Sequence, residues 1–149
     1  MLRLSKKTDY ALIALTFIAA SDKPASAREI AERHDVPLEL MAKVLQRLVR
    51  MRLLASTQGT RGGYMLGRPP DAISVAEVIE AIDGPFTVTA CSTDKHYCEQ
   101  FNKCSIRDPL WQIRERIAAA LETVTIAEIA AENVPVSVAH AAVLHQARH

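Results

Sequence analysis

The chain has 149 residues, of which 49% are hydrophobic and 23% are charged, and its formal net charge is +1. This length suits one well-packed domain, or one small domain with an appended dimerisation element, and the composition is that of a soluble globular protein. No apolar run approaches the roughly 18 residues that a transmembrane helix needs, so we expect no membrane partner.

The two halves of the chain differ in charge. Residues 1–68 hold 12 Lys and Arg against 6 Asp and Glu, whereas residues 69–149 hold 6 against 11. A basic half is typical of a protein that meets an anionic polymer at one end. Two differently solvated surfaces would explain the same split, so charge alone leaves both interpretations open.

The N-terminus has basic residues ahead of an apolar stretch, which is the outline of a signal peptide. Asp9 and Tyr10 interrupt this stretch, and a further helical pattern follows it directly. We therefore interpret residues 6–20 as the first core helix of a cytoplasmic protein, with a secretory signal as the alternative. Free thiols fit a reducing compartment better than an oxidising one.

Two further helices are predicted before residue 52. Ser26 and Glu29 have the spacing of a capping box and open a short helix to about Arg33. Pro37 suits the first turn of a longer helix to about Arg52. Apolar residues recur along that helix at intervals of three and four, which predicts a buried stripe of Leu38, Met41, Val44, Leu45, Leu48 and Met51.

A hairpin is predicted next, with strand candidates at 53–57 and 64–66. Three glycines within residues 58–63 permit positive φ angles at its tip, where Arg61 lies. Helix, short helix, turn, longer helix and hairpin is the order of a winged helix-turn-helix. We predict a mainly α fold with a small β-hairpin wing, and assign residues 1–70 to the DNA-binding domain.

The second half is predicted to hold a capped helix, a cysteine loop at about 86–108 and a long helix. Ser74 and Glu77 form a second capping box, and the helix that they open ends at Asp83-Gly84-Pro85. Asp108 can cap the long helix, which runs from Pro109 to about Thr123.

A third capping box, Thr125 with Glu128, opens a short final helix. We assign residues 71–132 to a second unit, which holds the cysteine loop and the long helix, and expect the tail, 133–149, to be partly disordered.

In a helix-turn-helix, the N-terminal residues of the second helix enter the major groove, and flanking cations contact phosphates. Gln can pair with adenine, Arg with guanine, and Glu can accept from cytosine. Taken singly, these side chains are ordinary solvated charges, but the hairpin and the charge split favour DNA binding. The candidate DNA contacts are Lys6, Lys7, Arg28, Pro37, Glu39, Lys43, Gln46, Arg47, Gln58 and Arg61.

All three cysteines of the chain, Cys91, Cys98 and Cys104, lie within fourteen residues of a polar segment. An odd number cannot pair completely in disulfides, and a polar loop is a poor place for buried thiols. The cysteines could hold zinc with His96 as a fourth ligand, or an iron–sulfur cluster with a fourth ligand from elsewhere. The spacing of the cysteines alone favours an iron–sulfur cluster over zinc only modestly.

Taken together, these motifs resemble the bacterial iron–sulfur-cluster transcriptional regulators typified by IscR and NsrR. The resemblance covers about residues 1–130 and is carried, in order, by LSKKTDYALIALTFIA, the helix-turn-helix, the glycine wing at 59–66, ISVAEVIEAIDGP and the cysteine loop. It implies a homodimeric repressor or activator on a palindromic operator in double-stranded DNA. It also implies that Cys91, Cys98 and Cys104 hold a [2Fe–2S] or [4Fe–4S] cluster.

The resemblance further implies that helix 109–123 packs against its counterpart in a partner subunit. The candidate dimerisation residues are Leu110, Trp111, Ile113, Ile117 and Leu121. Implied signals are iron–sulfur status, redox stress or nitric oxide, and the N-terminal segment is closest to the subgroup that regulates SUF-type cluster assembly.

The fourth ligand departs from the family pattern. The branch that regulates cluster assembly has a His three residues after the last cysteine, and Arg107 stands there. The nitric-oxide branch uses an Asp of the first helix, donated by the other subunit, and Asp9 matches it. An acid at a helix N-terminus is also favoured by the helix dipole, so both interpretations of Asp9 stay open. His96 is a further candidate for the fourth ligand of the cluster.

The wing departs as well, because Gln58 replaces the usual Arg before the first wing glycine. Arg61 would then make the minor-groove contact, or the DNA specificity differs. No nucleophile–base pair and no paired carboxylates suggest catalysis, so we expect no enzyme. The alternative function is a zinc-binding or thiol-redox protein.

Overall fold

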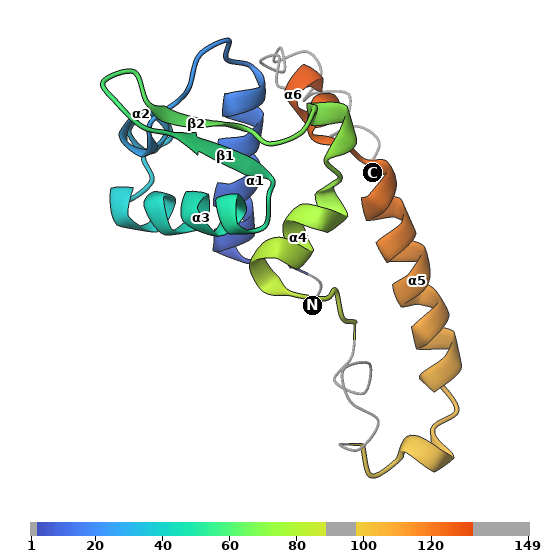
Figure 1. Ribbon diagram of the computed structural model, residues 1–149. Coiled ribbons are helices and arrows are strands. Elements are labelled where there is room, and N and C mark those ends of the chain that lie inside the picture. Colours follow the sequence, from blue (N-terminus) through green and yellow to red (C-terminus); the bar gives the residue numbers. More distant parts are fainter. Residues whose placement is uncertain (1–2, 89–97, 133–149) are drawn as a thin grey trace, which may run out of the picture.

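The structure, a computed structural model, describes residues 3–88 and 98–132 (Figure 1). These residues form six α-helices, one two-stranded antiparallel sheet and two short 3-10 turns. In chain order they are α1 (Lys6–Ala19), α2 (Ala27–Arg33), α3 (Leu38–Arg50), β1 (Leu54–Thr57), β2 (Gly63–Leu66), η1 (Pro70–Ala72), α4 (Val75–Asp83), η3 (Phe101–Lys103), α5 (Arg107–Thr123) and α6 (Ile126–Glu132). The predicted winged helix-turn-helix order is confirmed.

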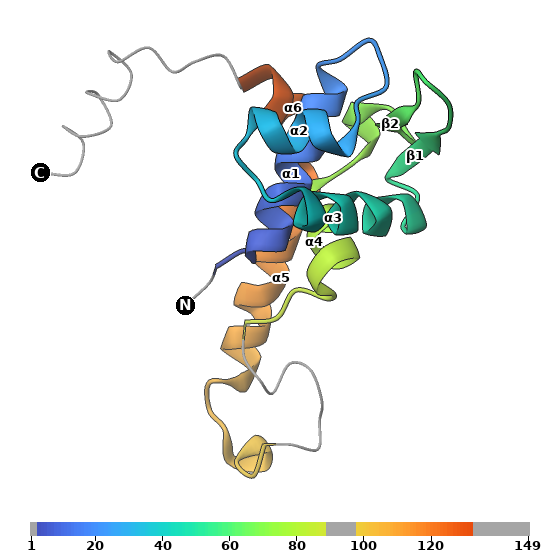
Figure 2. The ribbon, with the colours of Figure 1, turned by 90° about the vertical axis from the view of Figure 1, so that its left-hand side faces the viewer.

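The hydrophobic core surrounds α1, which contacts α3, α4, α6 and the wing. Ser5 begins this helix by accepting a hydrogen bond from the amide of Thr8 at 3.1 Å. Ala11, Ala14 and Leu15 are fully buried, and the small side chains of the two alanines allow the neighbouring helices to pack closely on α1. Figure 2 shows α3 crossing α1, with α6 and α2 packed at the upper end of the body.

The central part of the stripe predicted for α3 is confirmed, since Met41, Val44, Leu45 and Leu48 are buried. The prediction is wrong at both ends, because Leu38 and Met51 are exposed at 38% and 41%. The apolar stripe is longer than the surface against which α3 packs, so its terminal side chains reach beyond the core.

The wing pairs β1 with β2 from Leu54↔Leu66 to Thr57↔Gly63. It is anchored to the segment before α2, because Tyr64 and Ala25 exchange backbone hydrogen bonds of 2.7 and 3.1 Å. A Cβ at Gly63 would lie 2.7 Å from the Ala25 carbonyl oxygen, so this close approach requires glycine. Gly59 has φ +110° and forms the turn at the tip.

Two capping boxes predicted in the second half are confirmed. Ser74 and Glu77 exchange bonds of 3.2 and 3.0 Å at the start of α4. Thr125 and Glu128 do the same at the start of α6, at 3.3 and 3.2 Å. The two starts lie side by side, because the amide of Val75 donates to the carbonyl of Val124 at 2.9 Å.

The predicted cap of α5 is wrong. The helix begins at Arg107 with Ile106 as its N-cap residue and no side-chain cap, so Asp108 already lies in its first turn. The Asp108 carboxylate instead accepts from Nε of Arg107 at 2.8 Å, and this contact lowers the pKa of Asp108. An ion pair with its neighbour therefore takes the place of a backbone cap.

The long helix α5 extends away from the body formed by α1–α4, and η3 lies beyond its far end in both ribbon views (Figures 1 and 2). None of the described helices is long and apolar enough to cross a membrane. Cys91, His96 and the predicted tail, 133–149, fall outside the described residues.

Candidate nucleic-acid interface and cysteine segment

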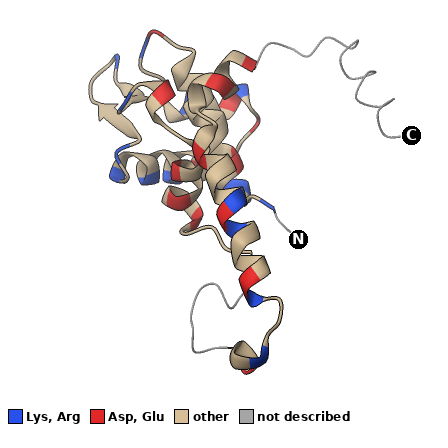
Figure 3. Cartoon of the chain, turned by 90° about the vertical axis from the view of Figure 1, so that its right-hand side faces the viewer, with Lys and Arg blue, Asp and Glu red and all other residues tan. Residues whose placement is uncertain are grey.

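The recognition helix α3 carries the exposed basic residues Lys43, Arg47 and Arg50, and Figure 3 shows Lys and Arg along it with acidic positions on α4 nearby. Every candidate DNA contact named from the sequence is exposed, as binding requires. On α3 these are Glu39, Lys43, Gln46 and Arg47, preceded by Pro37, which is the N-cap residue of the helix.

The remaining candidates surround α3 on three elements. Lys6 and Lys7 occupy the first turn of α1, and Gln58 and Arg61 lie at the tip of the wing between β1 and β2. Arg28 on α2 forms an exposed i,i+4 ion pair with Glu32 at 3.9 Å. An exposed pair of this kind contributes little to stability, so Arg28 can exchange it for a phosphate.

Arg47 has a role that the sequence did not reveal. Its Nε donates to the carbonyl oxygen of Ala81 at 2.8 Å, joining the recognition helix to the last turn of α4. A cation suits that position because the carbonyl end of a helix is partly negative. Arg47 therefore orients α3 against α4.

A second polar junction joins α4 to the start of α1. The Asp83 carboxylate accepts from Ser5 Oγ and from Thr8 Oγ1, each at 2.7 Å, and Thr8 is fully buried. In the sequence, Asp83 is recognisable only as part of a helix-stop signal. Ser5 and Thr8 lie at the start of a helix more than seventy residues away, so no sequence pattern predicted that they would donate to Asp83.

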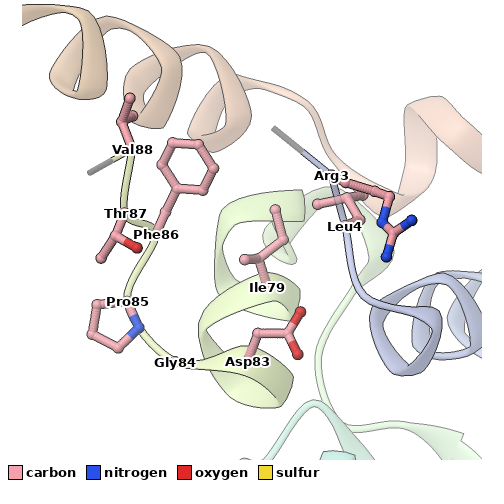
Figure 4. A pocket seen from close by; sticks show the side chains of 9 residues that line it. All are labelled: Arg3, Leu4, Ile79, Asp83, Gly84, Pro85, Phe86, Thr87 and Val88. Carbon is pink, nitrogen blue, oxygen red and sulfur yellow. The ribbon is translucent and has the colours of Figure 1, made fainter. Parts of the chain in front are cut away.

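Beyond Asp83 the chain turns at Gly84, which has φ +85°, and enters the cysteine loop. The turn borders a cavity of about 440 Å³ between the N-terminal segment and the end of α4. Figure 4 shows Arg3 and Leu4 on one side of this cavity, with Pro85 to Val88 on the other. Nε of Arg114 on α5 donates to the carbonyl of Phe86 at 3.0 Å and so holds this exit segment.

Two of the three cysteines can be placed. Cys98 and Cys104 are free thiols, both half-buried, on either side of η3. Among the described residues, no three His, Cys, Asp or Glu side chains gather as a metal site. The described part of the loop therefore supplies two thiols at one end of α5, and Cys91 is not among the described residues.

Arg107, which cannot act as a ligand, orders this segment. Its guanidinium lies over the Phe101 ring at 4.7 Å, and its Nη1 donates to the Phe101 carbonyl at 3.2 Å. The amide of Phe101 in turn donates to the carbonyl of Cys98 at 3.0 Å. These contacts hold the backbone between Cys98 and Cys104 in one conformation.

Asp9 lies in the first turn of α1 and is half-buried. Figures 1 and 2 both show the start of α1 beside α4, well separated from η3 at the far end of α5. Within one chain, then, the first turn of α1 is not adjacent to the described cysteines.

The helix α5 has no fully buried residue, although it is 17 residues long. Leu121 borders a hollow that α5 forms with α4, and Trp111 stacks with Arg114 at 5.1 Å. Ile113 is 46% exposed, whereas Leu110 and Ile117 are half-buried. One side of α5 therefore packs on its own chain and another side is open.

Comparison with known proteins agrees with this arrangement. The profile of the Rrf2 family, described as iron-dependent transcriptional regulators, matches residues 4–132. The HTH-type transcriptional regulator IscR of Yersinia pseudotuberculosis is 35% identical over 131 residues, which cover 86% of this chain and 79% of that protein. IscR of Erwinia tasmaniensis is 34% identical over the same share of this chain and 78% of its own.

Two solved structures share the fold. CymR, the global cysteine regulator of B. subtilis, superposes with a TM-score of 0.73 at 24% identity, over 89% of this chain and 99% of its own. IscR of T. potens superposes with a TM-score of 0.69 at 24% identity, over 88% of each chain. The solved structures show the fold, and the profile and the IscR relatives establish that the chain belongs to the Rrf2 family of transcriptional regulators.

Proposed function

We propose that the chain is a homodimeric DNA-binding regulator whose operator binding responds to an iron–sulfur cluster held by Cys91, Cys98 and Cys104. The observation that supports this most is the combination in one chain of a basic winged helix-turn-helix with free, half-buried thiols at the far end of α5. The IscR relatives support iron–sulfur sensing, and the resemblance suggests SUF-type assembly genes as targets.

The donor set fits such a group. Thiolates are the ligands that iron–sulfur clusters take, and Cys98 and Cys104 are neither paired nor fully buried. A bound cluster would supply redox chemistry. It would also hold its three thiolate ligands at fixed positions relative to one another. The protein's own contribution is positional, because Arg107 and Phe101 hold the backbone between the two thiols.

We propose Asp9 of the partner subunit as the fourth ligand. The start of α1 and the described cysteines are separated within one chain, which suits donation between subunits rather than within one. A ligand on α1 would tie the cluster to the helix that Asp83 joins to α4. His96 remains the other candidate.

The dimer is proposed to form along α5. Ile106, Leu110, Ile113, Ile117, Ala120 and Val124 repeat at intervals of four and three residues, which is the spacing of a coiled-coil seam. Ile106 is 59% exposed and Ile113 is 46% exposed, so this seam is open in the single chain. Trp111 and Leu121 lie beside the seam, and Leu121 borders the hollow between α5 and α4.

Anaerobic purification tests the cluster. We expect a coloured protein whose charge-transfer absorption and iron content are lost in Cys98→Ala and retained in Ser105→Ala, an exposed neighbour. A colourless protein with stoichiometric zinc would support the zinc alternative, and a colourless, metal-free protein whose thiols respond to oxidants would support the thiol-redox alternative.

A second experiment tests the fourth ligand. Asp9→Ala should keep the iron content but change the absorption or Mössbauer spectrum, because one ligand is replaced. Asp22→Ala, an exposed acid just beyond α1, is the control. A spectrum identical in both variants would remove Asp9 from the ligand set.

A further inference from the structure

A basic groove runs along one side of the recognition helix. Lys43, Arg47 and Arg50 of α3 line it together with Lys7 of α1, and buried Val44 forms part of its floor. The groove holds about 330 Å³, and we call it the α3 groove.

Charge points to what the α3 groove binds. None of the described residues that line it is acidic, so its four cations have no counter-charge within the groove. Cations gathered at a spacing of three and four residues along a helix repel one another until an anion screens them. A nucleic-acid backbone, with a regular series of phosphates, supplies such screening.

Three apolar residues, Leu40, Val44 and Ile82, also line the α3 groove, and Leu40 is the exposed one among them. Leu40 lines it and is 41% exposed, on the N-terminal turn of α3. Base edges are contacted from that turn in a helix-turn-helix, and an apolar side chain there can contact the 5-methyl group of thymine. Leu38 has nearly the same exposure, 38%, but does not line the groove.

We propose that the α3 groove seats one DNA strand, with its phosphates on the cations and the methyl group of one thymine per half-site against Leu40. Leu40 is then a specificity-determining residue, which rests on the proposed DNA-binding function. Arg47 serves the phosphates in this arrangement, because its bond to the Ala81 carbonyl holds the guanidinium in the groove.

Deoxyuridine substitution tests the proposal, because deoxyuridine lacks only the 5-methyl group of thymidine. An operator is first selected from random duplexes with the full chain, and each thymine is then replaced in turn. At one thymine per half-site we expect the affinity of the unaltered protein to fall about fourfold, the loss for one buried methyl-sized group.

Leu40→Ala should bind the thymine and deoxyuridine operators equally at that position, whereas Leu38→Ala should keep the fourfold discrimination as the matched control. Leu40→Asn, which keeps the branching at Cγ but replaces both methyl groups by polar atoms, should behave as Leu40→Ala does. Discrimination that survives both Leu40 variants, or that Leu38→Ala alone removes, would overturn the assignment. A change in the dimerisation constant of Leu40→Ala would instead place a second copy in the groove.

The experiment distinguishes a failure of DNA binding from a failure of the role assigned to Leu40. If no specific operator can be selected even with the unaltered protein, the DNA-binding function itself is wrong. If an operator is selected but no thymine shows methyl discrimination, only the role of Leu40 is wrong.

Discussion

At the residue scale, Ser74 and Glu77 cap the N-terminus of α4. Its hydroxyl accepts from the amide of Glu77 at 3.2 Å, and the Glu77 carboxylate accepts from the amide of Ser74 at 3.0 Å. Burial raises the pKa of Glu77, but the backbone bond from Ser74 and the guanidinium of Arg68 outweigh it, so the pKa is lowered overall.

Ser74→Ala should lower the free energy of unfolding by about 1 kcal/mol, because the first turn of α4 loses its cap. Urea titration measures the change. Ser56→Ala, at an exposed position of β1, is the control and should change the free energy by less than about 0.5 kcal/mol. Equal effects of the two substitutions would show that the cap does not contribute.

The lowered pKa of Glu77 predicts an acid-dependent contribution to stability. The group stabilises the fold above its ordinary pKa of 4.5, and the contribution is lost as the pH falls through the lower pKa of the folded protein. The difference in unfolding free energy between the unaltered protein and Glu77→Gln should thus be constant from pH 7 to about pH 5.5 and shrink below pH 4.5. A difference that grows toward acid pH would contradict this assignment.

At the element scale, α4 is the helix that meets both α1 and α3 through specific polar bonds. Asp83 holds two hydroxyls of α1, and the Ala81 carbonyl holds Arg47 of the recognition helix. Together, these bonds fix the orientation of α4, which leads into the cysteine loop, relative to α1 and α3.

Asp83→Ala should lower the free energy of unfolding by about 1–3 kcal/mol, because the buried hydroxyl of Thr8 loses its acceptor. Thermal and urea unfolding check this. Asp71→Ala, an exposed acid in η1, is the control and should be nearly neutral. A neutral Asp83→Ala would mean that water replaces the carboxylate without loss.

Sequence patterns predicted most elements because their signals are local. Capping boxes at Ser74 and Thr125 involve residues three apart, and the glycines of the wing act within one turn. Asp108 was misassigned because capping competes with an ion pair to Arg107, which the spacing of residues does not encode. Leu38 was misassigned because periodicity cannot show where the opposing surface ends.

At the scale of the whole molecule, the proposed dimer depends on the open side of α5. Ile113, in the four-and-three repeat, is 46% exposed, whereas Gln112 lies on another side of the same turn. A charge introduced at these neighbouring positions should therefore have very different effects.

Ile113→Glu should convert the proposed dimer to a monomer at micromolar concentration, because a carboxylate would be desolvated in the seam. Gln112→Glu, which adds the same charge one residue away, should leave the dimer intact. Sedimentation equilibrium distinguishes the two. A dimer that persists in Ile113→Glu would place the interface elsewhere.

The sequence by itself determined the family, the helix-turn-helix order, the wing and the existence of the cysteine loop. These depend on local spacing and composition, which a linear chain displays directly. The division into residues 1–70 and 71–132 stays a prediction, as do the cluster ligands.

Only the tertiary structure decided which side chains work together. It joined Asp83 to Ser5 and Thr8 across more than seventy residues, turned Arg47 toward α4, and placed Leu40 among the cations of the α3 groove. These pairings depend on how helices cross. Crossing is determined by packing over the whole core, and no short stretch of sequence contains that information.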